Sequence, residues 1–204
     1  MRVVVFGAGR VGSSLVKFLE EKRDLKIVVV DEDKRVCDVL ASESNANVIC
    51  GDATDPKLLD ELNLKGADFV FAVTGNEEVN FLTSVYAKQA NCKSVISRSS
   101  EPKYSKLMER LDIQPLISEA TLARELANMA VSPVISKMLD PTYSHIELLE
   151  KEVSNDLNNV TVADATKKKG FMIVSIYDNE KFMEPSPKVV LKKGMKIITI
   201  KYNL

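Results

Sequence analysis

The first 118 residues alternate short apolar runs with longer stretches in which apolar residues recur at helical spacing. Such short runs are typical of strands that are buried on both faces of a parallel sheet. They cover 3–6, 27–30, 48–50, 69–73, 94–97 and 114–117, and the helical stretches include 34–46, 57–62, 77–90 and 104–111. This alternation predicts an α/β domain of the Rossmann type, with a doubly wound parallel sheet of six strands.

Residues 119–139 predict one long helix that is apolar over too much of its circumference. A surface helix of a monomer needs an apolar stripe of only about 100°. We interpret the excess as a contact surface for a second subunit or for the next domain. The alternative is a helix that is buried in the core of its own chain. Pro133 is expected to kink or interrupt this helix.

The pattern changes after a break at Asp140, Pro141 and Thr142. Strand-like segments then follow at 145–153, 171–177, 181–183 and 196–201, with one short helix at 161–168. About 60 residues are too few for the substrate domain of a dehydrogenase, but enough for a small regulatory or dimerisation module. The predicted organisation is therefore a Rossmann domain over 1–118, a crossover and dimerisation helix over 119–142, and a small α+β domain over 143–204.

Charge and cysteine content argue against a nucleic-acid-binding protein and against a disulfide-bonded one. Lys and Arg number 28 and Asp and Glu 29, without long blocks of one sign, so we expect no nucleic-acid partner. The one basic cluster, Lys167–Lys169, precedes Gly170 and predicts the end of a helix. Cys37, Cys50 and Cys92 are far apart and form no CxxC pair, which indicates reduced thiols packed as small apolar groups.

No apolar run approaches the roughly 18 to 20 residues that cross a bilayer, and no signal peptide precedes the first strand. We expect a cytoplasmic chain that does not insert into a membrane itself. A function at a membrane would require another chain.

The sequence Gly7-Ala8-Gly9-Arg10-Val11-Gly12 follows the first strand and opens the first helix. Gly7 permits a sharp turn, Gly9 lets the backbone approach a pyrophosphate, and Gly12 lets the helix pack close to the strand. Asp31 lies 19 residues after Gly12, at the end of the second strand, where a carboxylate can accept both ribose hydroxyls. Together these features predict a site for an adenine nucleotide. The alternative is a glycine-rich turn without a ligand.

Residues for catalysis are scarce. The single histidine, His145, lies past the first domain in a strand-like stretch, where a surface or packing role is the better interpretation. Tyr177 and Lys181 have the Tyr-x-x-x-Lys spacing of short-chain dehydrogenases, but a turn, Asp178-Asn179-Glu180, separates them. We interpret that spacing as chance.

Polar residues instead follow the strands, where open parallel sheets bind ligands. They are Gly51, Asp52, Ala53 and Thr54 after the third strand, Thr74, Gly75 and Asn76 after the fourth, Arg98 after the fifth and Glu119 after the sixth. For Thr54 and Asn76 a role as helix cap or turn former is equally open. A cation at Arg98 suits contact with a phosphate, and a carboxylate at Glu119 suits a phosphate-bound divalent ion.

The chain resembles the cytosolic regulatory subunits of bacterial and archaeal Trk and Ktr potassium uptake systems and the equivalent RCK (KTN) domains of potassium channels. The resemblance rests on the glycine motif, on Val29-Val30-Asp31, on Gly51-Asp52-Ala53-Thr54 and on the segment Thr74–Asn80. The second domain is similar to the small C-terminal domain of that family in 161–165, 170–174 and 185–195. Family members usually carry an acid where this chain has Met195.

The resemblance implies a role for each of these positions. Gly7, Ala8, Gly9, Arg10 and Val11 would wrap the pyrophosphate, Asp31 would hold the ribose, Asp52 and Ala53 would lie near the adenine, and Thr74 and Gly75 would flank the phosphates or a second ribose. Arg10 would reach the terminal phosphate of ATP. Glu119 would help to hold the divalent ion that accompanies ATP, although many relatives have proline before that glutamate and this chain has Ser118.

The resemblance further implies a regulator that binds NAD(H) or ATP and ADP without catalysis. Homodimers would form through the long helix and assemble into a ring at the inner face of the membrane, beneath a potassium-translocating subunit. A rival interpretation is an NAD-dependent oxidoreductase with unrecognised catalytic residues, and a third is a structural module with a vestigial site.

Overall fold

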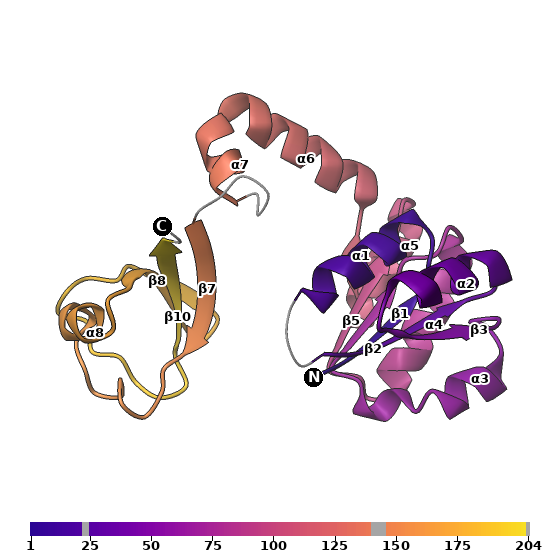
Figure 1. Ribbon diagram of the computed structural model, residues 1–204, viewed down its shortest axis with the longest axis horizontal. Coiled ribbons are helices and arrows are strands. Elements are labelled where there is room, and N and C mark those ends of the chain that lie inside the picture. Colours follow the sequence, from indigo (N-terminus) through magenta and orange to yellow (C-terminus); the bar gives the residue numbers. More distant parts are fainter. Residues whose placement is uncertain (22–24, 140–145, 203–204) are drawn as a thin grey trace. The chain divides into compact units, whose positions relative to one another are not determined.

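The computed structural model describes residues 1–21, 25–139 and 146–202, which form two compact units, Met1–Ala123 and Arg124–Leu204 (Figure 1). The strands of the first unit are β1 (Arg2–Phe6), β2 (Lys26–Asp31), β3 (Asn47–Cys50), β4 (Phe69–Ala72), β5 (Ser94–Arg98) and β6 (Gln114–Leu116). Its helices are α1 (Arg10–Glu20), α2 (Lys34–Glu43), α3 (Pro56–Glu61), the 3-10 helix η1 (Leu64–Gly66), α4 (Glu77–Gln89) and α5 (Pro102–Arg110). His145 and the predicted break at 140–142 lie outside the described residues.

The six strands form one parallel sheet in the order β3-β2-β1-β4-β5-β6. Because side chains alternate across a strand, β1 supplies both faces of the sheet. Val3 and Val5 pack with Val16 of α1, whereas Val4 and Phe6 pack in the cluster that contains Met108 of α5. All six side chains are fully buried. The predicted Rossmann arrangement is confirmed. The strands are apolar on both faces because helices pack against each face of the sheet.

The predicted long helix is interrupted at Pro133, as the proline indicated. Helix α6 covers Ser118–Val131, and α7 covers Pro133–Leu139 with the proline at its first position. No residue of α6 is buried, and Leu122 and Leu126 are 62% and 57% exposed. The alternative of a helix buried in the core of its own chain is therefore wrong. Among the described residues, no helix combines the length and apolar character that crossing a bilayer requires.

The second unit contains an antiparallel sheet in the order β7-β10-β8-β9. Its elements are β7 (Ile146–Glu152), α8 (Val162–Lys169), β8 (Met172–Asp178), β9 (Lys181–Met183) and β10 (Lys196–Tyr202). Lys167–Lys169 form the last turn of α8, and Gly170 ends the helix at a φ of +69°, as predicted. Tyr177 and Lys181 lie on the two paired strands of a hairpin and not on one helix. The small α+β domain is thus confirmed.

Candidate nucleotide-binding site

The glycine motif forms a tight turn between β1 and α1. Gly7 has a φ of +102°, and a Cβ there would lie 2.8 Å from the backbone nitrogen of Thr74. A Cβ on Gly12 would lie 1.8 Å from the carbonyl oxygen of Gly7. A Cβ on Gly9, in contrast, would meet nothing within 4 Å. Gly7 and Gly12 are therefore required by the fold itself, while the space beside Gly9 is open to a ligand.

Asp31, the last residue of β2, holds this turn in place. The backbone N–H of Ala8 donates to Asp31 Oδ2 at 2.6 Å, and the N–H of Asp33 donates to Oδ1 at 2.9 Å. Its carbonyl oxygen accepts from Gly51 N at 2.9 Å. Hydrogen bonds to a charged acceptor are among the stronger ones in proteins. The carboxylate expected at the ribose therefore also orders the glycine motif.

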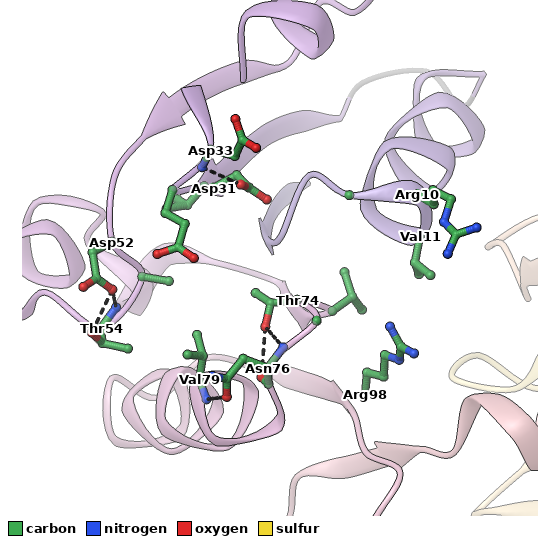
Figure 2. A pocket seen from close by; sticks show the side chains of 16 residues that line it. Arg10, Val11, Asp31, Asp33, Asp52, Thr54, Thr74, Asn76, Val79 and Arg98 are labelled. Atoms are coloured by element: carbon green, nitrogen blue, oxygen red, sulfur yellow. Dashed lines mark hydrogen bonds between the residues drawn. The ribbon is translucent and has the colours of Figure 1, made fainter. Parts of the chain in front are cut away.

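A cavity of about 580 Å³ opens at the carboxyl ends of the parallel strands (Figure 2). Its lining comes from the ends of β1, β2, β3, β4 and β5 and from the first turns of the helices that follow. The lining residues are Gly9, Arg10, Val11, Val30, Asp31, Glu32, Asp33, Asp52, Ala53, Thr54, Val73, Thr74, Gly75, Asn76, Val79 and Arg98. A volume of this size is in the range that encloses a nucleotide.

Most residues that the sequence singled out lie together in this cavity. Gly7 and Ala8 do not line it, and the N–H of Ala8 is engaged by Asp31. Glu119 does not line it either, because it lies exposed in the first turn of α6. Among the described residues no three His, Cys, Asp or Glu side chains are grouped as a metal site would require.

The sequence analysis did not assign five of the lining residues to the site, namely Val30, Glu32, Asp33, Val73 and Val79. Glu32 and Asp33 follow Asp31 directly, and Asp33 also caps α2 by accepting from Arg35 N at 2.8 Å. The position of these acids after a buried strand could have indicated them. Val79 is apolar and lies in the first turn of α4, where no polar signal marks it. Asn76 both lines the cavity and caps α4, so the two roles left open for it coexist.

Opposite charges line opposite ends of the cavity. Figure 2 shows Asp31, Asp33 and Asp52 at one end and the guanidinium groups of Arg10 and Arg98 at the other. Hydrogen bonds from Thr54 N and Thr54 Oγ1, both at 2.7 Å, lower the pKa of Asp52 below its usual range. In the part of the chain that the structure describes, neither arginine side chain forms an ion pair. The arginine end is thus free to contact an anion.

Asn80 joins the ends of β4 and β5 beneath the cavity. Its side chain is 2% exposed. Its Oδ1 accepts from Thr74 N at 2.9 Å and from Thr74 Oγ1 at 2.7 Å, and its Nδ2 donates to the carbonyl oxygen of Arg98 at 3.3 Å. A buried amide that is hydrogen-bonded on both sides fixes the relative position of its partners. Asn80 therefore sets the place of Thr74 and of Arg98.

Glu77, at the start of α4, holds the loop that follows Arg98. Its carboxylate accepts from Ser99 Oγ, from Ser100 N at 2.9 Å and from Glu101 N at 3.0 Å. Burial acts to raise the pKa of Glu77, but the hydrogen bonds outweigh burial and the pKa lies below its usual value. A depressed pKa in the folded state means that the carboxylate form stabilises the fold.

Glu77→Gln is therefore expected to lower the melting temperature most at neutral pH. The difference from the unsubstituted protein should shrink as the pH falls from about 6 to about 3, because the stabilisation is complete above the unfolded pKa of about 4.3 and is lost through the lower folded pKa. Thermal melts across this range measure it. Glu78→Gln, at the exposed neighbouring position, serves as the control, and a difference that stays constant with pH would contradict the assignment.

Comparison with known proteins gives consistent matches. The model of the TrkA-N domain family matches residues 3–119. A Trk system potassium uptake protein TrkA homolog of Methanothermobacter thermautotrophicus is 32% identical over 200 residues, which cover 97% of this chain and 92% of the relative.

Among solved structures, the GsuK RCK domain superposes with a TM-score of 0.51 at 16% identity, over 98% of this chain and 44% of that one. The GsuK channel bound to NAD superposes with a TM-score of 0.50 at 18% identity, over 98% of this chain and 36% of that one. At these identities the two structures show a shared fold.

Proposed function

The chain belongs to the TrkA-N domain family, and on that premise we propose that it is a nucleotide-sensing regulatory subunit of a potassium uptake system. The observation that carries the proposal is the cavity at the carboxyl ends of the strands, with acids at one end and two free arginines at the other. An adenine nucleotide has a matching polarity, since its ribose hydroxyls donate to carboxylates and its phosphates pair with cations.

The ligand is oriented by these two ends. The ribose of an adenosine lies at Asp31 and the adenine near Asp52 and Ala53, while the phosphates pass Gly9 and approach Arg10. Thr74, Gly75 and Arg98 then contact the distal phosphates or a second ribose. The candidates are NAD(H) and ATP or ADP, and NAD is bound by the GsuK channel, which has the same fold. Among the described residues no cluster of three metal-ligating side chains includes Glu119, and the role of Glu119 toward a divalent ion that accompanies ATP stays a prediction.

Regulation without catalysis fits the lining of the cavity. None of the lining residues is a His, Tyr, Lys or Cys that could relay a proton to or from a substrate beside a nicotinamide. A sensor needs no such group, because a ligand shifts a conformational equilibrium by its differential affinity for the two states. That coupling is typically about 1 to 3 kcal/mol per site.

The partners follow from the same proposal. A relative over nearly the whole chain is named as a Trk potassium uptake protein, which supports a potassium-translocating membrane protein as the target. The exposed apolar helix α6 supports a homodimer. Such dimers would assemble further into a ring at the inner face of the membrane, with the chain held there by its partner.

Isothermal titration of the purified protein with NADH, NAD, ADP and ATP, with and without magnesium, tests the proposal. At least one nucleotide is expected to bind. Gly9→Ala should then weaken that binding by at least about tenfold, because a Cβ would occupy the space through which the pyrophosphate approaches the backbone.

Gly66→Ala is the matched control, since its Cβ would make only an ordinary contact, 3.6 Å from the Arg2 side chain, and neither residue lines the cavity. Circular dichroism should show both variants folded. If none of the four nucleotides binds the unsubstituted protein, the proposed function is wrong. If Gly9→Ala binds normally, the nucleotide does not lie along the glycine motif.

A further inference from the structure

Two of the three cysteines meet beside the acidic end of the cavity. Cys37 lies in the first half of α2 and is buried, whereas Cys50 is the last residue of β3 and is exposed. Cys50 pairs with Asp31 in the parallel register of β2 and β3. The Cys37 thiol donates to the carbonyl oxygen of Asp31 at 3.3 Å. Both residues are therefore anchored to the residue that orders the glycine motif.

Each sulfur atom lies close to the backbone of the segment that carries or precedes the other cysteine. Cys37 Sγ is 4.0 Å from the carbonyl oxygen of Ile49, the residue before Cys50, and Cys50 Sγ is 3.8 Å from the carbonyl oxygen of Glu32. The two thiols are close enough for Cys50 to contribute, after burial, to the raised pKa of Cys37. The expectation that all three cysteines pack as small apolar groups is correct for Cys37 and Cys92 and wrong for Cys50, which faces solvent.

We infer that Cys37 and Cys50 form a redox-modification site, at which a hydroperoxide closes a disulfide that weakens nucleotide binding. This inference rests on the nucleotide site proposed above. The two cysteines adjoin both acidic segments of the cavity, because 31–33 joins β2 to α2 and 52–54 follows Cys50 within two residues. A disulfide between them would tie the first half of α2 to the end of β3.

The chemistry begins at Cys50, the exposed thiol. Its sulfur attacks the hydroperoxide, an S–O bond forms as the O–O bond breaks, and the thiol proton leaves with the departing oxygen as water or, from an organic hydroperoxide, as an alcohol. The sulfur of Cys37 then attacks the sulfur of Cys50. An S–S bond forms, the S–O bond breaks, and the Cys37 proton leaves with the hydroxyl as water.

Burial and, after it, the neighbouring Cys50 thiol raise the pKa of Cys37 to about 11. Cys37 therefore stays a protonated thiol at neutral pH. The first step falls to Cys50 because its thiol is exposed to the oxidant. Cys37 then acts only as the second thiol, toward the oxidised neighbour.

The bond would change the geometry of the cavity. A disulfide brings its sulfur atoms to about 2.05 Å, much closer than two thiols in van der Waals contact. Cys37 would also lose the proton that it donates to Asp31. Asp33 caps α2 and also lines the cavity. If the disulfide shifts the first turn of α2, Asp33 therefore moves at the end of the cavity that holds the ribose. We expect nucleotide affinity to fall by about tenfold.

The test compares the reduced full-length chain with the same chain treated with hydrogen peroxide. Oxidation is expected to remove two hydrogens. Cleavage after Glu43, which lies between the two cysteines, should then leave the two fragments joined until a reductant is added. Titration of the oxidised protein with the nucleotide that binds the reduced protein should give an affinity about tenfold weaker than that of the reduced protein. Adding the reductant should restore the original affinity. Cys50→Ser should abolish both effects, and the variant should fold because the position is exposed.

Cys92→Ala is the matched control and should retain both effects, because the Cys92 thiol lies in another part of the sheet, where it donates to the carbonyl oxygens of Ala67 and Ser94. If peroxide does not join the fragments while the reduced protein binds nucleotide, the inference is wrong and the proposed function stands. Equal affinities of the joined and reduced forms would also overturn the inference. Absence of binding to the reduced protein would overturn both.

Discussion

Gly12→Ala is expected to lower the free energy of unfolding by about 3 kcal/mol or more. The added Cβ would lie 1.8 Å from the carbonyl oxygen of Gly7 and 2.8 Å from its carbonyl carbon, and neither backbone atom can turn away. Helix α1 would have to move off the sheet, which would loosen the contact of Val16 with Val3 and Val5. Chemical denaturation monitored by circular dichroism measures the effect.

Gly9→Ala is the matched control for stability. It introduces the same methyl group three residues away, at a φ of −61° and with nothing within 4 Å. Its free energy of unfolding should remain within about 0.5 kcal/mol of the unsubstituted protein. An unchanged denaturation midpoint for Gly12→Ala would mean that α1 does not approach the first turn as closely as the structure shows.

Leu122→Asp combined with Leu126→Asp is expected to convert a dimer into monomers. The two side chains lie four residues apart and therefore on one face of α6, and both are more than half exposed in the single chain. Burying a leucine contributes about 1.5 to 3 kcal/mol. Losing two per subunit should weaken association by more than about a hundredfold. Analytical ultracentrifugation over a range of concentrations measures the change.

Asn128→Asp adds a charge on the opposite face of the same helix and should leave the dimer intact. Because no residue of α6 is buried in the chain's own core, the double variant should keep the circular dichroism spectrum of the folded protein. A dimer that survives both aspartates would place the subunit contact elsewhere.

The sheet could be predicted from the sequence because its strands are buried on both faces. Residues 3–6 and 27–30 are apolar at every position, and such runs fit a parallel sheet covered by helices. The carboxyl ends of parallel strands lie at one edge, so the polar residues after each strand could be assigned to one cavity before any contact was known. Asp52, Thr74 and Arg98 come from three different strand ends and do line it.

What the sequence could not predict depends on side-chain direction and register. The motif that contains Ala8 gave no sign that the N–H of this residue donates to Asp31 rather than facing the cavity. Cys37 and Cys50 are 13 residues apart, and only the pairing of Cys50 with Asp31 brings them together. Cys50 is exposed because it is the last residue of β3. The pattern of apolar residues does not define well where a strand ends.

The hydrogen bond from Ala8 to Asp31 has a consequence for binding strength. A flexible phosphate-binding turn must be immobilised by its ligand, and the lost conformational entropy weakens the complex. Here the turn is immobilised by a carboxylate of the same chain, at 2.6 Å, so that ordering takes place during folding. The site is pre-organised, and little of the nucleotide's interaction energy is spent on shaping the turn that receives it.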